Sequence, residues 1–448
     1  MNNQDSQEHP EAPRADRVAS EVREDGTLIE MVYDPQRRQT SFVVSHNGQC
    51  RFAPSLEVGG SRRIVPFSPE NNLIRGNALL LPSAPEEYGS EQQLIQEIQE
   101  YIHRYVDLSP AFERLASYYV LMSWVYDAFN EVPYLRVRGD FGTGKSRFLL
   151  VVGALCYKPF FASGASTVSP IFHTLDAFRG TLVIDEGDFR FSDEKAEIVK
   201  ILNNGNIRGF PVLRTMVTDS REYNPKAFHV FGPKLVATRG EYDDRALESR
   251  FLTEEMGHNP LRADVPINLP PAYATEALKL RNKLLLYRLR NFHRIAIDPS
   301  VIDPALEPRL NQIFVPLKSV VDDKAFRDEL IGVARDLQAR LIASRGFELE
   351  TQLLEIIRDL IDSNSGAISI KAITAQFMER HGDQYGYKIT HRWIGGVLRR
   401  KLHLLPQKGH STYVIPVSEI PHLDVLFTKF GIDAKRPRSD DQSTASGS

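Results

Sequence analysis

The sequence predicts an α/β fold class: a parallel sheet with flanking helices, a helical lid, a C-terminal winged helix-turn-helix and a small N-terminal β-rich module. Short apolar runs alternate with helical stretches between residues 132 and 257, which is typical of a parallel sheet with crossover helices. The glycine-rich segment GDFGTGKS (139–146) separates the first of these runs from a helical stretch. After residue 346, the order helix, strand, two helices and hairpin favours a winged helix.

The composition places the chain among ordinary globular proteins of several domains. Its 448 residues exceed the roughly 50 to 250 residues of single domains. The net charge of -3 gives no overall basic signal, so a nucleic-acid surface would have to be a local patch. The only cysteines, Cys50 and Cys156, lie far apart and exclude a disulfide framework or a four-ligand zinc site.

The N-terminal third predicts a leader and two modules. Residues 1–26 contain few large apolar residues, and we expect a disordered leader. Residues 27–90 alternate apolar β-formers with turn residues and predict a small β-rich module, and residues 91–131 predict helices that lead into the core. The chain has no apolar run near the ~20 residues of a membrane span and no apolar signal core at its start, so we expect no membrane contact and a cytoplasmic location.

The remaining boundaries follow the same patterns. Residues 132–257 predict the sheet-containing core, and residues 258–345 predict an all-helical lid. Residues 346–418 predict the winged helix, and residues 419–448 predict a partly disordered tail.

The spacing in GDFGTGKS satisfies that of a phosphate-binding loop. Glycines let successive backbone amides curl around an anion, Lys145 can reach terminal phosphates, and the Ser146 hydroxyl can ligate Mg²⁺. The alternative is a glycine-rich turn that holds no ligand. The candidate nucleotide-binding residues are Gly139, Gly142, Thr143, Gly144, Lys145, Ser146 and Arg147.

Two further apolar strands end in polar residues. The run GTLVIDEGD delivers Asp185, which would hold Mg²⁺ together with Ser146, and Glu186, which would orient and deprotonate the attacking water. The alternative is that this acidic pair only caps a strand. The run PKLVATRG ends in Thr238, which can sense a terminal phosphate.

The segment DDRALESRF supplies Arg245 and Arg250. An arginine that projects toward a neighbouring subunit can stabilise the charge of a transition state. Spacing alone favours solvated or ion-paired roles for both residues.

Taken in order, GDFGTGKS, LVIDE, KLVAT and ALESRF resemble the core of AAA+ ATPases, and more narrowly the minichromosome-maintenance-like helicases of bacterial mobile elements and phages. The resemblance implies that Lys145 and Ser146 bind ATP and Mg²⁺ and that Arg250 acts in trans as an arginine finger, with Arg245 as a weaker companion. It also implies a second sensing arginine in the lid, for which Arg309 is the best match. The competing lid arginines are Arg281, Arg288 and Arg290.

The sequence also departs from that family. Its proper members have a large N-terminal domain with an oligonucleotide-binding barrel and commonly a zinc site, and their first sensor is usually asparagine. Here the β-rich module is short, and Thr238 stands at the sensor position. DNA loading and ring assembly are therefore expected to differ.

Two segments are candidates for DNA contact. Residues 205–232 contain two β-like runs around a polar tip, which resembles the channel hairpin of such helicases; the alternative is an ordinary hairpin with solvated charges. The second helix of the winged helix would carry further basic residues, while Trp393, Ile394, Val397 and Leu398 are expected in its core. The candidate phosphate contacts are Arg208, Arg214, Arg221 and Lys226 in the hairpin, and Arg392, Arg399, Arg400 and Lys408 in the winged helix.

These patterns favour an ATP-driven DNA helicase or translocase that acts in replication of a mobile element or phage. It would form a homo-hexamer or similar ring, with single-stranded DNA in the channel and ATP hydrolysed between subunits. The alternative is an ATP-switched regulator or defence ATPase that acts on a protein partner or an operator without unwinding. Unwinding of forked DNA separates the two.

Overall fold

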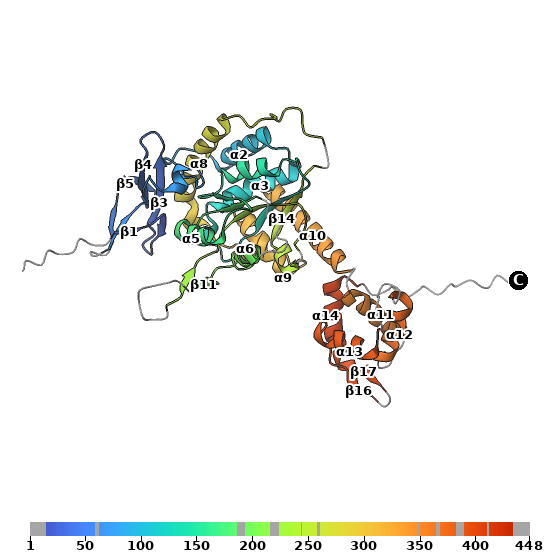
Figure 1. The fold of residues 1–448 in the computed structure, drawn as a ribbon. Helices are drawn as coiled ribbons and strands as arrows, with labels where there is room; N and C mark the ends of the chain where they lie inside the picture. Colours follow the sequence, from blue (N-terminus) through green and yellow to red (C-terminus); the bar gives the residue numbers. More distant parts are fainter. Residues whose placement is uncertain are drawn as a thin grey trace, which may run out of the picture. The chain divides into compact units, whose positions relative to one another are not determined.

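The protein is described by a computed structural model that covers residues 15–58, 62–185, 193–215, 224–242, 244–257, 260–346, 349–363, 368–381, 389–409 and 412–432. The chain divides into two compact units, Met1–Gly332 and Val333–Ser448 (Figure 1). Helix α10 (Lys324–Gly346) spans the division.

The first unit begins with a β-rich module of two small sheets, in agreement with the prediction. One sheet has the antiparallel order β2-β3-β4-β5 and the other the order β1-β7-β6. Asn47 and Gly48 both adopt positive φ (50° and 78°), which is the backbone of a tight hairpin turn between β4 and β5. The strands are β1 (Ala15–Arg17), β2 (Ser20–Val22), β3 (Leu28–Asp34), β4 (Gln39–His46), β5 (Gln49–Ala53), β6 (Leu56–Val58) and β7 (Arg62–Val65).

The module starts earlier than the sequence predicted. Strands β1 and β2 lie inside the segment 1–26 that was expected to be a disordered leader, and this expectation is wrong from residue 15 onward. Strand β1 pairs with β7, with Asp16 opposite Ile64, and Ala19 is buried. Strands of three residues are too short to show periodicity, and their partners lie up to 48 residues away.

The centre of the first unit is a five-stranded parallel sheet, which confirms the predicted α/β class. Its order is β14-β8-β13-β10-β9, and every neighbouring pair is parallel. Strands β8 and β13 are almost wholly buried, as expected for a parallel sheet covered on both faces. The strands are β8 (Tyr134–Arg138), β9 (Phe160–Ala162), β10 (Leu182–Ile184), β13 (Lys234–Thr238) and β14 (Phe251–Glu255).

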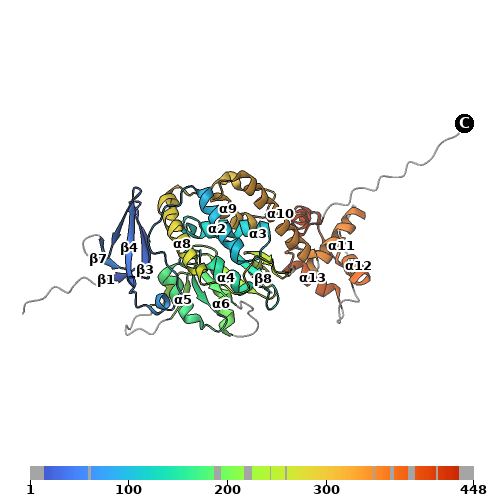
Figure 2. The same ribbon diagram turned by 90° about the horizontal axis from the view of Figure 1, so that it is seen from above.

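The sheet is flanked by the crossover helices α4 (Lys145–Gly153), α5 (Val168–Phe178) and α6 (Asp193–Asn204). Helix α4 packs on β8, β10 and β13, the three central strands, and Figure 2 shows it beside β8. Because the strands are parallel, their carboxyl ends meet at one edge, where ligand sites form in such sheets. The residues that follow β8, β10 and β13 are therefore brought together.

A helical layer joins the predicted lead-in to the predicted lid. Helix α2 packs against α3 and α8, and α3 packs against α9. Tyr118 of α3 stacks on Phe326 of α10 at 4.6 Å between ring centroids, and Arg114 donates to Glu329 at 2.7 Å. The helices of this layer are α2 (Glu91–Tyr105), α3 (Pro110–Ser123), α8 (Ala272–Asn291), α9 (Pro308–Ser319) and α10. Within the ranges described above, no helix combines the length and apolarity needed to cross a membrane.

A buried ionic network ties the β-rich module to the core and to α8. Glu30 of β3 lies 3.0 Å from Lys158 and 2.7 Å from Arg288 of α8, and Arg288 also contacts Asp127 at 2.6 Å. The Tyr157 hydroxyl also belongs to this network and donates a hydrogen bond to the Glu30 carboxylate at 2.9 Å. The side chains of Glu30, Lys158 and Arg288 are at most 2% exposed.

The second unit contains α11 (Leu349–Ser363), β15 (Ile368–Ser369), α12 (Ile370–His381), α13 (His391–Arg400), β16 (Gln407–Lys408), β17 (Tyr413–Ile415) and α14 (Ile420–Phe430), with sheet order β15-β17-β16. This order agrees with the predicted succession of elements. Ile394, Val397 and Leu398 are buried in its core and Trp393 packs against them, which confirms that expectation. Helix α14 lies in the segment predicted to be a partly disordered tail, and it is ordered because Leu423 and Phe427 enter this core.

Candidate functional site

The loop between β8 and α4 has a backbone that only glycine accommodates. Gly142 and Gly144 adopt φ of 77° and 91°, in the left-handed region. A side chain at Gly139 would place its Cβ 2.6 Å from the carbonyl oxygen of Met256. The glycines of GDFGTGKS are therefore explained by geometry, and they form a backbone cradle at the start of α4.

The next two residues present the polar groups that the sequence predicted. Lys145 begins α4, and its Nζ donates to the carbonyl oxygens of Gly139 and Asp140, both at 2.6 Å. Ser146 Oγ donates to Asp185 Oδ2 at 2.6 Å. Asp185 follows β10 directly, so the fold brings together the two expected magnesium ligands although 39 residues separate them.

Thr238 ends β13, the strand that lies between β8 and β10 in the sheet. It is 1% exposed, and its Oγ1 has no hydrogen-bond partner among the described residues. A buried hydroxyl without a partner costs about 1–3 kcal/mol. The orphaned hydroxyl next to the glycine loop is therefore suited to a polar ligand atom.

A cavity of about 350 Å³ lies at the glycine loop, a volume within the usual range of ligand sites. Lys145, Ser146, Asp185, Gly142 and Gly144 line it. Arg147 lines it too, and it also donates to the carbonyl oxygens of Pro266 and Ile267. One carboxylate and one hydroxyl suit Mg²⁺, which usually takes one or two carboxylates and completes its shell with water and phosphate oxygens. Within the described ranges, no cluster of three or more His, Cys, Asp or Glu side chains could hold a metal alone.

Arg239 is a lining residue that the sequence reading missed. It follows Thr238, and its guanidinium carbon lies 3.7 Å from the ring centroid of Phe141, which is 76% exposed on the glycine loop. The signal that could have found it is its position, because the residue after a strand-end sensor necessarily starts at the same edge of the sheet.

Arg250 was expected to project toward a neighbouring subunit, but it does not project from the surface. Its side chain is buried and donates to Asn206 Oδ1 and Asn203 Oδ1 at 2.8 Å, and to the carbonyl oxygen of Ala246 at 2.6 Å. Burial lowers the pKa of this guanidinium from its usual value. Arg250 thus joins the end of α6 to α7 (Arg245–Glu248) within the same chain.

None of the candidate lid arginines lines the loop cavity. Arg309 instead lies beside α7, where its Nη2 donates to the Ala246 carbonyl at 3.4 Å. Arg281 donates to the Ala154 carbonyl, Arg288 belongs to the buried network, and Arg290 pairs with Glu87 at 2.7 Å. In this conformation the expected second sensor is therefore not at the site, because each of these arginines is held by other groups.

Two predicted residues, Glu186 and Arg221, lie outside the described residues. Arg245 begins α7, but its side chain is likewise outside them.

The predicted hairpin is present as antiparallel strands β11 (Val212–Arg214) and β12 (Lys226–Phe228). Its basic residues are engaged locally. Arg214 pairs with Glu197 and lies 4.0 Å from the ring centroid of Phe172, and Lys226 pairs with Asp176 at 3.2 Å. Arg208 donates to the Asp127 carbonyl and lies over Phe231.

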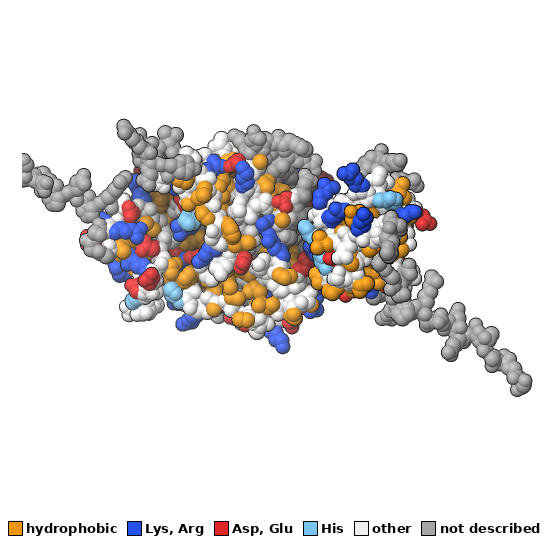
Figure 3. All heavy atoms as spheres, turned by 90° about the horizontal axis from the view of Figure 1, so that it is seen from below, with side chains coloured by type: hydrophobic (Ala, Val, Ile, Leu, Met, Phe, Trp, Pro, Cys, Tyr) orange, Lys and Arg blue, Asp and Glu red, His pale blue; other side chains and the backbone are white. Residues whose placement is uncertain are grey.

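The basic residues predicted in the second unit are all exposed. Arg392, Arg399 and Arg400 lie on α13, and Lys408 lies on β16. The face of this unit seen in Figure 3 carries a gathering of Lys and Arg side chains. Arg399 lies 5.8 Å from the ring centroid of Tyr413 on β17, so helix and strand contribute to one surface.

No protein-family model matches the chain, and no curated protein matches it in sequence. Among solved structures, the chain is similar to the A-form apo structure of the NrS-1 C-terminal region, with 13% identity over 86% of this chain and 96% of that chain and a TM-score of 0.35. It is also similar to the structure of JCV helicase, with 13% identity over 56% of this chain and 61% of that chain and a TM-score of 0.23. These values are low, and the function is therefore proposed from the geometry of the site.

Proposed function

We propose that the protein is a magnesium-dependent ATPase that acts as a ring-forming DNA helicase or translocase in replication of a mobile element or phage. One observation carries the ATPase: the glycine cradle, the Ser146–Asp185 pair and the unpartnered Thr238 hydroxyl converge on one edge of a parallel sheet. This is the constellation that phosphoryl transfer from ATP requires.

Each residue has a separate role in this proposal. Loop amides and Lys145 hold the phosphates, and Ser146 and Asp185 hold Mg²⁺, which when bound neutralises charge on the β- and γ-phosphate oxygens. Thr238 donates a hydrogen bond to the terminal phosphate or to the attacking water. Glu186, next to Asp185 in the sequence, is the proposed general base.

The ring assignment is proposed from the family resemblance. Among the described residues, the arginines that line the cavity are Arg147 and Arg239, and an arginine from a neighbouring subunit would complete the charge stabilisation. Arg250 is the proposed finger, and its use requires that α6 and α7 release it from Asn203 and Asn206 on assembly.

DNA is the proposed substrate of the motor. The β11–β12 hairpin would line the channel, and the exposed basic residues of α13 and β16 would contact duplex DNA if the second unit is a winged helix. The same basic surface also favours a second function, an ATP-switched regulator that binds an operator without unwinding.

Unwinding of forked DNA by the purified chain, with ATP turnover measured with and without single-stranded DNA, tests the proposal. We expect strand displacement and stimulated turnover, both lost in Lys145→Ala because the phosphates lose their charged ligand. Lys279→Ala is the matched control, since Lys279 is an exposed lysine on α8. If DNA does not change the rate of ATP turnover and the forked DNA is not unwound, the second function, an ATP-switched regulator, is favoured instead.

A further inference from the structure

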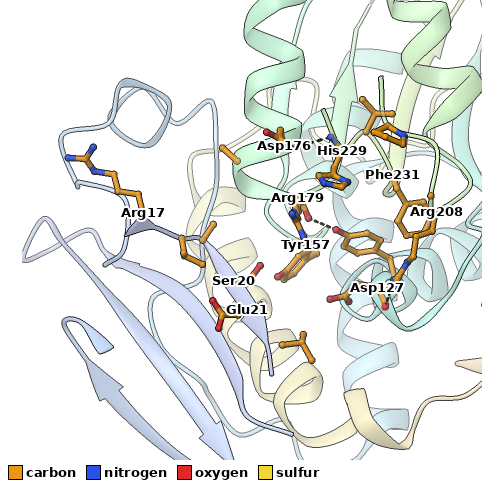
Figure 4. A pocket seen from close by; sticks show the side chains of 18 of the residues that line it. Arg17, Ser20, Glu21, Asp127, Tyr157, Asp176, Arg179, Arg208, His229 and Phe231 are labelled. Carbon is orange, nitrogen blue, oxygen red and sulfur yellow. Dashed lines mark hydrogen bonds between the residues drawn. The ribbon is translucent and has the colours of Figure 1, made fainter. Parts of the chain in front are cut away.

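A second and larger cavity, of about 820 Å³, lies between the β-rich module and the base of the β11–β12 hairpin (Figure 4). Residues 17–22 of the module form one wall, and residues 207–211 and 229–231, which flank the hairpin strands, contribute to the other. It shares no lining residue with the nucleotide cavity. We call it the module cleft.

The module cleft carries an excess of positive charge. Five arginine and lysine residues line it against three acidic residues. Each acidic residue already has a cationic partner: Glu21 pairs with Arg62 at 3.3 Å, Asp176 with Lys226 at 3.2 Å, and Asp127 with Arg288 at 2.6 Å.

Three lining arginines remain without a carboxylate partner among the described residues: Arg17, Arg179 and Arg208. They stand on both walls, because Arg17 belongs to β1 whereas the other two belong to the core (Figure 4). Arg208 donates one hydrogen bond to the Asp127 carbonyl oxygen, and the other guanidinium N–H groups of the three arginines can bind an anionic ligand that spans the cleft.

Arg179 has a backbone conformation that residues other than glycine rarely adopt. Arg179 ends helix α5 with φ 50° and ψ 44°, a left-handed conformation that costs a residue other than glycine roughly 1–2 kcal/mol. It is exposed, and its side chain has no bonded partner among the described residues.

Aromatic groups accompany the arginines. Phe210 lies in the segment before β11, close to Arg208 in the sequence, and is 64% exposed. The Arg208 guanidinium carbon lies 5.4 Å from the ring centroid of Phe231. An exposed aromatic ring interleaved with arginines is the usual platform for single-stranded nucleic acid, because every base can stack and every phosphate can pair. Small-molecule pockets instead are mostly apolar with a few convergent polar groups.

We propose that the module cleft binds a segment of single-stranded DNA, with Arg17, Arg179 and Arg208 on its phosphates and Phe210 against a base. The inference rests on the proposed function and deepens it, since it gives the β-rich module the role of second wall of a DNA clamp beside the hairpin.

Arg179→Gly tests the cleft with a substitution that the fold tolerates, because glycine relieves the left-handed strain. Arg38→Gly is the matched control: Arg38 is also exposed, has φ 53° and lies outside the cleft. Binding of fluorescein-labelled oligothymidylate is followed by anisotropy over a series of salt concentrations. Arg179→Gly should weaken binding about threefold to tenfold and reduce the log–log salt slope by about 0.7, whereas Arg38→Gly should change neither.

Phe210→Ala examines stacking independently of charge, with Phe52→Ala as its control because Phe52 is 59% exposed on β5. We expect about tenfold weaker binding for Phe210→Ala and an unchanged salt slope. If each variant and its control have equal affinities and salt slopes, and DNA still stimulates turnover by the chain, the proposal that the cleft binds DNA is wrong but the proposed function stands. A wild-type chain that neither binds the oligonucleotide nor responds to DNA would overturn the proposed function as well.

Discussion

The buried polar side chains at the two ends of strand β13 differ in whether they have hydrogen-bond partners. At the amino end, Lys234 is fully buried, and its Nζ donates to the carbonyl oxygens of Val230 and Gly232 at 2.9 Å and of Gly205 at 3.2 Å. At the carboxyl end, the Thr238 hydroxyl is equally buried and has no partner among the described residues. The strand therefore carries a satisfied polar group at its amino end and an unsatisfied one at its carboxyl end, beside the glycine loop.

An unpartnered hydroxyl is not in itself a site. Thr181, just before β10, also has a buried Oγ1 without a partner in the described part of the chain, yet it lies at the opposite edge of the sheet. What distinguishes Thr238 is its position between the strands that deliver the glycine loop and Asp185. The comparison indicates that position at the sheet edge decides which orphaned group has a use.

Replacing Lys234 should lower the stability of the fold. Lys234→Met keeps the apolar stem but removes the donor from three buried carbonyl groups, and we expect a loss of about 2 kcal/mol in the free energy of unfolding. Urea unfolding of the variant measures it, with Lys279→Met on the exposed face of α8 as the control. Equal midpoints for the two variants would show that the carbonyl contacts contribute nothing.

The second prediction separates the two threonines by turnover. Thr238→Val and Thr181→Val each remove a buried hydroxyl without a partner, so both should fold and neither should lose stability. Only Thr238→Val should lower ATP turnover, by about tenfold, because it removes a hydrogen bond to the phosphate or the attacking water. A similar loss in both variants would assign the effect to packing of the sheet.

The third prediction is a dependence of stability on pH. Burial lowers the pKa of Lys234 to about 7 and that of Lys158 to about 8, from 10.5. The unfolded chain then binds more protons than the folded chain between pH 7 and 10.5, so stability should rise with pH in this window, by at most about 1.4 kcal/mol per pH unit for each lysine. Urea unfolding at pH 7 and pH 9 measures the rise, which should shrink in Lys234→Met. An identical rise in that variant would contradict the assignment to Lys234.

The central sheet and the glycine loop were predictable because their signals are local. Gly142, Gly144, Lys145 and Ser146 follow one another in a fixed spacing, and the apolar runs of β8 and β13 are continuous. The meeting of Ser146 with Asp185 also followed, since parallel strands align their carboxyl ends.

Other features depend on long-range partners that no local pattern encodes. The short strand β1 is defined by its pairing with β7, and α14 by the core that receives Phe427. Arg250 and Arg309 were expected to act as finger and sensor because of their positions in the sequence. Their side chains instead donate hydrogen bonds to acceptors in and next to α6 and α7. The cleft arginines Arg17 and Arg179 were not singled out, because one lies in the expected leader and the other shows its strain only in the backbone.

The buried network around Glu30 has a consequence for dissecting the protein. A shortened chain that begins at the central sheet would lack this carboxylate, so Lys158 would lose its ion partner and Arg288 would keep only Asp127 among the partners in this network. Uncompensated buried charge is strongly destabilising. The smallest piece of the chain that folds should therefore include the β-rich module, and the evolutionary loss or exchange of that module should require simultaneous change at both basic residues.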